Sequence, residues 1–593
     1  MPKSANTNGF SRRGFLAAGA GALAATAVGG WTPVYALPLD TGSLGSGSGT
    51  GSAGGATLPA PPNFPTDIEL AQQAYQNWSK EIMLDSVWTA TPKNSGDVVR
   101  LTNWAHANNY TLRPRGASHG WTPLTVVNGA SVDKVILVDT TKHLNGVVVN
   151  AAGSPATVTA GPGATLDAIT SALQEKNLGW ANLPAPGVLT IAGTLAVDAH
   201  GAALPADGQS ALPGHTYGSL SNLVTSLTAV VWTGTEYAER TYSRNDPKIK
   251  PLLTSLGRTF ITSVTMQAGP NFRMRCQSYT DIKWQEMFAP KGASGRTFES
   301  YVKSNGGVEA IWYPFTEKPW LKVWSVAPTK PGGSREVTGP YNYPFSDNLP
   351  ETVTDLLGKM NSGAPGIAPL FGQTMYSTTV AGLAATNASD IWGWSKDIQF
   401  YIKATTLRLT EGGGAVITSR ANIGQVIHDF AQWFNERIEF YKAKGQYPLN
   451  GPVEIRCCGL DQAADVKVGS AGAPTISAMR PRPDHPEWDT AIWLNVLGVP
   501  GTPGMFAFYR EMEQWMRSHY TGADYTFRPE WSKGWAFGPD KPYTDGGIIS
   551  GALPQSYRDG LPADDNWDTA RAVFNELDPH RVYSNTFMDQ LLP

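Results

Sequence analysis

Residues 113–120 read RPRGASHG, a stretch in which small residues surround a single histidine, His119. The two glycines can adopt backbone conformations that other residues avoid, and the alanine and serine between them add little bulk. Consecutive N–H groups in such a turn can cradle an anion. The stretch is therefore a candidate phosphate-binding turn, with an ordinary basic surface turn as the alternative.

A second candidate lies in PVEIRCC, residues 452–458, which we predict to be a strand. Glu454 and Arg456 are two positions apart, so on a strand their side chains face the same way and can pair. Oxidation of a secondary alcohol needs a group that accepts the hydroxyl proton and a partner for the developing alkoxide. The pair could supply both, and a structural ion pair is the alternative.

The segments around these candidates predict an α+β fold. Residues 134–140, 146–150 and 156–161 are β-branched runs that favour strands. Residues 95–109 and 165–177 have helical patterns, the second stopping near Gly179. Thr66 and Glu69 form a capping-box pattern, which predicts a further helix through about Lys80.

The order of these motifs resembles the vanillyl-alcohol oxidase family of FAD enzymes. After the turn come LPAPGVLTIAGTLAVDAHG at 183–201, YGSLSNLVTSLTAVVWTG at 217–234 and FITSVTMQA at 260–268. With RPEWSKGWAF at 528–537 and DPHRVYSN at 578–585, the chain is most similar to the covalent-flavin bacterial cholesterol oxidases. The resemblance implies a two-lobed FAD-binding domain and an α+β substrate-binding domain built on an antiparallel sheet.

The chain divides accordingly into an N-terminal leader and three folded parts. Ser11-Arg12-Arg13, the uncharged Ala/Gly stretch after them and the small residues Val34 and Ala36 predict a twin-arginine export signal. We therefore expect a secreted protein, exported folded. The predicted boundaries are 1–36 for the signal, 37–62 for a flexible linker, 63–273 for the FAD-binding domain, 274–520 for the substrate-binding domain, and 521–593 for a segment returning to the FAD-binding domain.

The resemblance also assigns residues to the cofactor. It implies that FAD is bonded through His119 to a methyl carbon of the isoalloxazine ring, with a noncovalent contact as the alternative. The family motif is R-G-x-G-H-S, and this chain differs from it at two positions flanking the histidine. The other implied cofactor-binding residues are Arg115, Gly116, Ala117, Ser118, Gly120, Gly187, Thr190, Gly193, Thr194, His200, Gly201, Ile261 and Asn585.

Seven residues are implied at the substrate end of the flavin, namely Glu309, Glu411, Glu454, Arg456, Asn495, Glu530 and Lys533. We predict that Arg456 stabilises the oxyanion. Glu309 has no evident cationic partner in the sequence, so we predict it to be the proton shuttle. Alternatively, Glu530 and Lys533 are a helix-spaced surface pair and Asn495 caps a turn.

The composition of the chain limits which kinds of molecule it is expected to bind. The chain has 46 Lys and Arg against 49 Asp and Glu, a net charge of −3, and no basic run, so nucleic acid is not implied. Only 16% of residues are charged, which fits a neutral or apolar substrate. The three cysteines include an adjacent pair, Cys457 and Cys458, and form neither a disulfide framework nor a metal-ligand spacing.

The resemblance therefore implies an oxidase that converts a 3β-hydroxysteroid such as cholesterol to the conjugated ketone and reduces dioxygen to hydrogen peroxide. We expect transient contact with membranes or lipid droplets to extract the sterol. A sugar-lactone or alditol oxidase of the same family is one alternative. A non-enzymatic extracellular lipid carrier is another.

Overall fold

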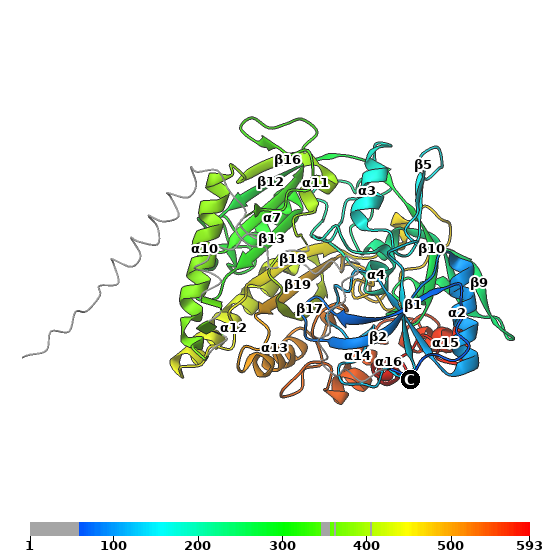
Figure 1. Cartoon of the computed structure of the whole chain (residues 1–593). Helices are drawn as coiled ribbons and strands as arrows, with labels where there is room; N and C mark the ends of the chain where they lie inside the picture. Colours follow the sequence, from blue (N-terminus) through cyan, green and yellow to red (C-terminus); the bar gives the residue numbers. More distant parts are fainter. Residues whose placement is uncertain (1–57, 345–355, 358, 361–362, 404–405) are drawn as a thin grey trace, which may run out of the picture.

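The computed structural model describes residues 58–593 except 345–355, 358, 361–362 and 404–405. Two sheets form one side of the molecule, on the right in Figure 1, and a large sheet forms the other side. The predicted export signal and most of the predicted linker lie outside the described residues.

The first sheet has four strands in the order β1 (Glu69–Gln76), β2 (Met83–Thr91), β4 (Val135–Asp139) and β3 (Thr111–Arg115). Helix α2 (Ser95–Asn108) packs its apolar side against β3 and β4 and confirms the predicted helix. The helix predicted from Thr66 to Lys80 is wrong, because residues 69–76 form β1. Their pairing with β2 along an antiparallel ladder outweighs a local sequence pattern that favours a helix.

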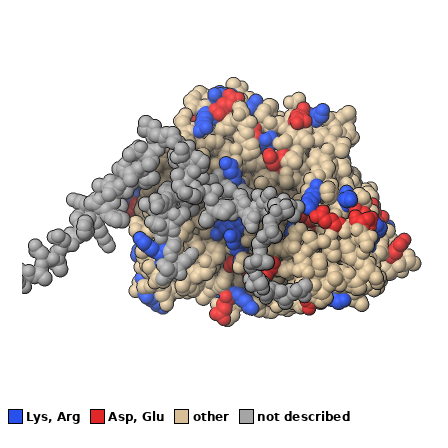
Figure 2. All heavy atoms as spheres, viewed as in Figure 1, with Lys and Arg blue, Asp and Glu red and all other residues tan. Residues whose placement is uncertain are grey.

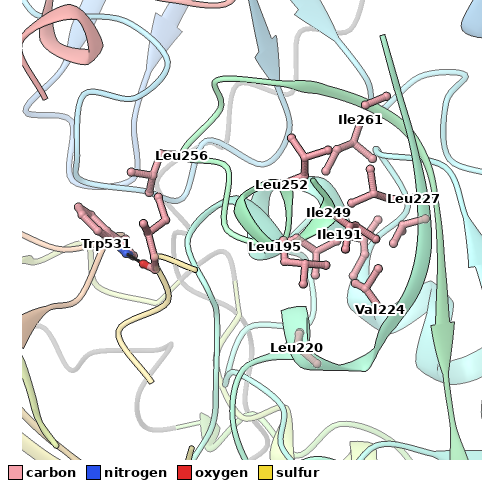
Figure 3. Close-up of a cluster of buried hydrophobic side chains, with 14 of the residues drawn as sticks. Ile191, Leu195, Leu220, Val224, Leu227, Ile249, Leu252, Leu256, Ile261 and Trp531 are labelled. Carbon is pink, nitrogen blue, oxygen red and sulfur yellow. Dashed lines mark hydrogen bonds between the residues drawn. The ribbon is translucent and has the colours of Figure 1, made fainter. Parts of the chain in front are cut away.

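The second sheet is antiparallel and also belongs to the N-terminal half. Its order is β5 (Val147–Asn150), β6 (Thr157–Ala160), β10 (Phe260–Gln267), β8 (Val224–Trp232) and β9 (Tyr237–Ser243). Around it lie α3 (Leu166–Gln174), α4 (Ile191–Ala196), η1 (Leu220–Leu223), α5 (Ile249–Leu252) and the short pair β7 (Leu178–Gly179) and β11 (Gly269–Pro270). The core between α4, α5 and β8 is aliphatic (Figure 3). The strands predicted at 134–161 and the helix predicted at 165–177 are confirmed.

A nine-stranded sheet forms the other side, antiparallel except at one edge. Its order is β15 (Arg335–Glu336), β16 (Asp390–Trp394), β12 (Arg273–Tyr279), β14 (Trp320–Val326), β13 (Gly307–Trp312), β18 (Val453–Gly459), β19 (Thr490–Gly498), β17 (Thr410–Thr418) and β20 (Thr526–Pro529). Its helices are α6 (Trp284–Met287), α7 (Phe298–Asn305), η2 (Pro365–Ile367), α10 (Ala368–Ala385), α11 (Ser395–Gln399), η3 (Arg420–Asn422), α12 (Ile423–Ala443), η4 (Ala463–Asp465) and α13 (Met505–His519). Helices α7, α12 and α13 share an apolar core with one face of the sheet, which leaves the other face free to line a cavity.

The C-terminal residues leave the nine-stranded sheet after β20 and pack on the N-terminal half. They contain η5 (Ile548–Ala552), α14 (Leu553–Ser556), α15 (Trp567–Leu577) and α16 (Thr586–Leu591). Trp531, Trp567 and Phe574 belong to the same apolar core as α4, α5 and β8. The C-terminal segment thus joins the nine-stranded sheet to the core of the N-terminal half.

Charge is sparse on the surface. Figure 2 shows basic and acidic side chains interspersed over one face, with large uncharged areas between them. Among the described residues, no helix has the length and apolar character needed to cross a bilayer.

Candidate active site

A cavity of about 380 Å³ lies between the N-terminal sheets and the nine-stranded sheet. Residues 116–122 and most residues of 184–200 and 255–261 line it from one side, and β13, β14, β17 and β18 contribute residues from the other. Its size falls within the range of small-molecule sites. The cavity therefore joins the two groups of residues that the sequence picks out.

The small-residue turn follows β3 directly and has the geometry of an anion cradle. No acceptor within the described chain bonds the backbone N–H groups of residues 116–120. A Cβ atom at Gly116 would lie 2.0 Å from Thr190 Oγ1, so only glycine allows this approach of the two segments. Ser118 has a left-handed φ of 54°, which makes the turn tight. Free amides in such a turn suit the pyrophosphate of FAD.

His119 projects from this turn into the cavity wall. Its ring stacks on Trp78 with 4.0 Å between centroids, and its Nε2 atom is buried without a hydrogen-bond partner in the described structure. Burial, with Lys533 and Arg408 nearby, lowers the pKa of His119 to about 3. The imidazole is thus neutral near pH 7 and has a lone pair free to bond a carbon atom.

The second glycine-rich stretch forms the adjoining wall. Thr190, Gly193, Thr194 and His200 line the cavity there, and Ile261 lines it from β10. The His200 ring stacks on Trp493 at 3.8 Å, and its Nε2 lies 3.7 Å from Glu530 Oε1. Together with the free amides and the unpartnered histidine, these residues fit an FAD molecule lying along the wall.

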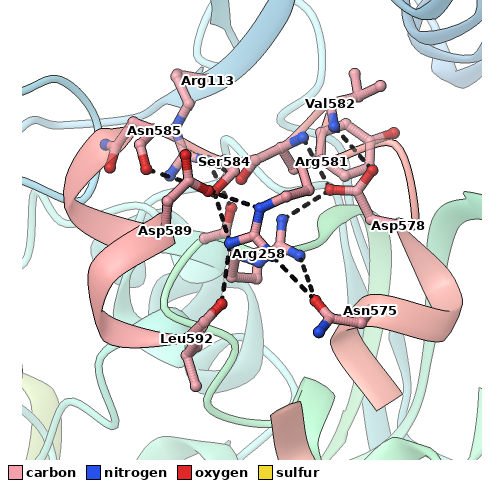
Figure 4. A network of polar contacts seen from close by, with 12 residues as sticks. Arg113, Arg258, Asn575, Asp578, Arg581, Val582, Ser584, Asn585, Asp589 and Leu592 are labelled. Carbon is pink, nitrogen blue, oxygen red and sulfur yellow. Dashed lines mark hydrogen bonds and ion pairs between the residues drawn. The ribbon is translucent and has the colours of Figure 1, made fainter. Parts of the chain in front are cut away.

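C-terminal residues support the turn from behind. Arg113, which is buried just before the turn, donates to the carbonyls of Tyr583, Leu124 and Gly257. Asn585 donates to the carbonyls of Pro123 and Leu124 and also caps α16, in the network drawn in Figure 4. The same network contains the buried ion pair Arg258–Asp578, at 2.8 Å.

Three carboxylates surround Arg456, which lines the same cavity. Arg456 Nη2 lies 3.8 Å from Glu411 Oε1, 3.8 Å from Glu454 Oε2 and 3.9 Å from Glu530 Oε2. It also donates to Asn495 Oδ1 at 3.1 Å. Burial acts to lower the pKa of Arg456, but the carboxylates raise it above its ordinary value, so the guanidinium stays charged.

The other partners of these carboxylates differ. Glu411 accepts from Lys533, and Glu530 accepts from Asn495 Nδ2 at 2.8 Å. Burial acts to raise the pKa of Glu530, but Lys533, His200 and Arg456 hold it below its ordinary value. Glu454 makes no hydrogen bond among the described residues, and burial raises its pKa to about 7 although Arg456 opposes this.

The charge balance of the cluster also favours Glu454 as the carboxylate that binds a proton. Three carboxylates, Glu411, Glu454 and Glu530, face two cations, Arg456 and Lys533. A buried cluster with one surplus carboxylate binds a proton readily. Burial raises the pKa of Glu411 as well, but Lys533 touches that carboxylate and opposes the shift. Glu454 is therefore the group best placed to take up and release a proton.

The prediction that Glu309 lacks a partner is wrong. Lys322 Nζ lies 3.1 Å from its Oε2, and Tyr401 Oη donates to both carboxylate oxygens at 2.9 and 2.8 Å. Lys322 stands opposite Glu309 in the register of β13 and β14, so a neighbouring strand supplies the cation. Glu309 is buried behind Lys322 and Tyr401, and both of these residues line the cavity.

Replacing Glu309 by Gln should therefore lower isomerisation by less than about tenfold, well below the usual contribution of a general base. The thermal midpoint should fall, because the change leaves the buried Lys322 ammonium without its carboxylate, a loss of about 1–3 kcal/mol. Isomerisation of a supplied 3-keto-5-ene steroid and thermal unfolding measure the two effects. A loss of isomerisation above a hundredfold would restore Glu309 as the shuttle.

The remaining predicted residues fall into two groups. Gly116, Ala117, Ser118 and Gly120 line the cavity, as do Glu411, Glu454, Arg456, Glu530 and Lys533. Arg115, Gly187, Gly201, Asn495 and Asn585 are not on its wall. Arg115 pairs with Asp139 at 2.8 Å, Asn495 lies within β19 behind Arg456, and Gly201 packs against the Leu183 carbonyl. These residues support the wall rather than face the cavity.

The alternatives for two of the predicted sites fail on geometry. Glu530 and Lys533 follow β20 in a turn, not on a helix, and both line the cavity. Asn495 lies in the middle of β19 and does not cap a turn.

Sequence reasoning missed several residues on the wall. They include the aromatic residues Trp78, Tyr313, Trp320, Tyr343 and Tyr401, together with Lys322 and Met375. Lys322 lies on β14, in a run where nothing marks one lysine as buried. Only the register of the sheet brings it to Glu309.

The described residues contain no group of three or more His, Cys, Asp or Glu side chains placed to hold a metal ion. The cysteines Cys276, Cys457 and Cys458 are buried and unpaired. Burial raises the pKa of Cys458 above its ordinary value, so it is not a reactive thiol.

Comparison with known proteins places this geometry in a family. Residues 88–238 match the model of an FAD binding domain, and residues 273–593 match a model described as cholesterol oxidase, substrate-binding. The fold and site thus define an FAD-dependent oxidoreductase of the vanillyl-alcohol oxidase type. The predicted α+β fold, with a substrate domain on an antiparallel sheet, is confirmed.

Similarity to solved structures indicates which FAD-dependent oxidoreductases this chain resembles. The chain is 73% identical to the cholesterol oxidase from Brevibacterium sterolicum, with a TM-score of 0.90 over 91% of this chain and 100% of that one. A histidine-to-alanine mutant of that enzyme matches equally well, at 73% identity and a TM-score of 0.90 over 91% of this chain and 100% of that chain. A solvent-stable cholesterol oxidase is 47% identical, with a TM-score of 0.89 over 90% of this chain and 100% of that chain. No curated protein sequence matched. The chain belongs to the family of FAD-dependent cholesterol oxidases.

Proposed function

We propose that the protein oxidises cholesterol to the 3-ketone, moves the ring double bond into conjugation and reduces dioxygen to hydrogen peroxide. One observation carries this proposal: the free amides, His119 and the Glu454–Arg456 pair all line one cavity. Much of the wall between them is apolar, including Ile311, Trp320, Met375, Leu407, Leu409 and Leu497. Such a wall suits a steroid ring system better than a polyol.

In this proposal a cationic residue stabilises the substrate oxygen and a carboxylate transfers the proton. Bound FAD supplies the acceptor for the hydride that leaves the alcohol carbon. Arg456, held in place by Asn495, stabilises negative charge on the substrate oxygen. Glu454 takes a proton from one ring carbon and returns it to another, because its carboxylate is not committed to another hydrogen bond. The apolar wall excludes water from the reacting carbons.

The direct test is to mix purified protein with cholesterol in detergent and follow three signals. We expect uptake of dioxygen, formation of hydrogen peroxide and the ultraviolet absorbance of a conjugated ketone, in a yellow protein. A colourless protein that binds sterol without consuming dioxygen would contradict the proposal.

The flavin is proposed to be tethered through His119, which is neutral, buried and unpartnered on the cavity wall. Such a bond would join an imidazole nitrogen to the methyl carbon of the flavin ring, and one C–H bond of the methyl group and the N–H bond of the imidazole would break. The two hydrogens displaced from the methyl group and the imidazole leave with an electron pair, and dioxygen accepts them as hydrogen peroxide.

Acid precipitation should leave nearly all of the yellow colour with wild-type protein and none with His119→Ala. Turnover of the variant should be slower but not absent, because the free amides of the turn still bind the pyrophosphate. The measurement is the flavin absorbance of pellet and supernatant. Wild-type flavin that washes out on denaturation would disprove the tether.

We also propose that the protein is exported folded and touches membranes or lipid droplets only transiently. The arginine pair at Arg12 and Arg13 supports export, and the low solubility of sterols in water supports lipid contact. Changing both arginines to lysine should keep the protein inside the cell, as measured by fractionation of the producing culture.

A further inference from the structure

Trp78 contacts His119, the residue proposed to bond the flavin. Nothing in the sequence around Trp78 indicates a role for it. It lies between β1 and β2, with 8% of its surface exposed, and lines the cavity. Its ring and the His119 ring stack with centroids 4.0 Å apart and planes 21° apart. No hydrogen bond of Trp78 itself fixes this arrangement within the described structure.

The neighbours of Trp78 restrict how the imidazole can turn. Trp121 meets His119 edge-on, at 6.1 Å and 78°, and its Nε1 donates to the Leu409 carbonyl at 3.0 Å. Arg408 lies 5.2 Å from the centroid of Trp78. The imidazole therefore has one aromatic ring stacked on its face and a second ring nearly perpendicular to it.

The backbone of the two turns is joined as well. Asn77, next to Trp78, donates from Nδ2 to the Gly120 carbonyl at 3.2 Å. It also accepts from Ile82 N at 3.0 Å, which closes the turn that carries Trp78. The turn at 77–82 thus holds its position relative to the turn at 116–120. The Trp78 ring that stacks on His119 is therefore held in a fixed position.

We infer that Trp78 is a positioning residue that holds the His119 ring in the plane from which it bonds the flavin. The inference rests on the proposed tether. Formation of a bond between two bound groups depends steeply on their alignment, and a misplacement of about 1 Å can cost about a hundredfold in rate. The stack supplies alignment, and burial by Trp78 keeps the imidazole neutral, as bond formation requires.

The test compares Trp78→Phe, which keeps an aromatic face, with Trp78→Leu, which keeps apolar volume but no ring. Trp104→Leu is the matched control, because Trp104 is also 8% exposed and packs in the same half of the chain, on Phe64. The readouts are total flavin per chain, the fraction retained after acid precipitation, and the thermal midpoint.

We expect Trp78→Leu to bind flavin but to retain at least about tenfold less of it covalently than wild type. Trp78→Phe should restore most of the retained fraction. Trp104→Leu should lower the thermal midpoint without changing the retained fraction. This separates positioning from general destabilisation.

The outcomes separate this inference from the tether itself. If wild-type flavin is fully extractable, the proposed tether fails, and the role of Trp78 fails with it. If wild-type and Trp78→Leu protein retain equal fractions, the tether stands and Trp78 does not position the ring. Should Trp78→Leu not fold, Trp78→Met replaces it and is read in the same way, with the tethering rate after FAD is added to apoprotein as the second measurement. An unchanged rate there overturns the inference.

Discussion

Replacing Arg456 by Met should lower cholesterol turnover about 10²- to 10³-fold, or roughly 3–4 kcal/mol of transition-state stabilisation. The guanidinium lies on the cavity wall, stays charged, and is oriented by Asn495 at 3.1 Å. It needs little rearrangement to stabilise negative charge on the substrate oxygen. Arg456→Lys keeps the charge but loses the planar fork, so it should recover only part of the loss.

Stability distinguishes a catalytic from a structural arginine. Removing Arg456 leaves Glu411, Glu454 and Glu530 facing only Lys533, so the pKa of Glu454 should rise further and the thermal midpoint should fall. The double variant Glu454→Gln, Arg456→Met should regain stability without regaining turnover. Steady-state rates and thermal unfolding of the two single variants, the double variant and wild type complete the cycle. Turnover of Arg456→Met within about threefold of wild type, well short of the contribution of such a donor, would make the pair structural.

Replacing Glu454 by Gln should lower isomerisation by about 10²- to 10⁴-fold, the range expected for loss of a general base. A 3-keto-5-ene steroid, supplied directly, bypasses oxidation and isolates this step. Glu309→Gln is the matched control, because Glu309 is a carboxylate on the adjacent strand that Lys322 and Tyr401 already hold. Isomerisation that survives in Glu454→Gln at the wild-type rate would assign the proton transfer to another group, with Glu411 the next candidate.

The pH dependence of isomerisation follows from the same carboxyl group. Burial raises the pKa of Glu454 to about 7, so below pH 7 the group is mostly protonated and cannot accept a proton. The rate should therefore rise with pH, reach half its plateau near pH 7 and level off above it. In Arg456→Met the midpoint should move to higher pH, because the cation that favours the carboxylate is gone. A flat profile between pH 5 and 8 would exclude Glu454 as the base.

The local pattern of the chain determined two helices and three strands of the N-terminal half. The spacing of apolar residues at 95–109 and the β-branched runs at 134–161 are properties of short segments, and the structure has a helix and strands there. The period of a strand also places Glu454 and Arg456 on the same side of β18. The small residues of 116–120 identified the turn, and at Gly116 only glycine allows the close approach of Thr190.

Tertiary structure decided the elements and partners that depend on distant residues. Residues 69–76 favour a helix locally, yet pairing with β2 makes them a strand. The partner of Glu309 is Lys322, which the antiparallel register of β13 and β14 brings opposite to it. Trp78 reaches His119 because two turns from separate parts of the first sheet are held together by Asn77. Segment patterns are set by neighbours along the chain, whereas the charge and orientation of a buried side chain depend on groups that folding brings together. The sequence therefore indicated the candidate carboxylates, and only the structure shows that Glu309 is bonded to Lys322 and Tyr401 whereas Glu454 makes no hydrogen bond among the described residues.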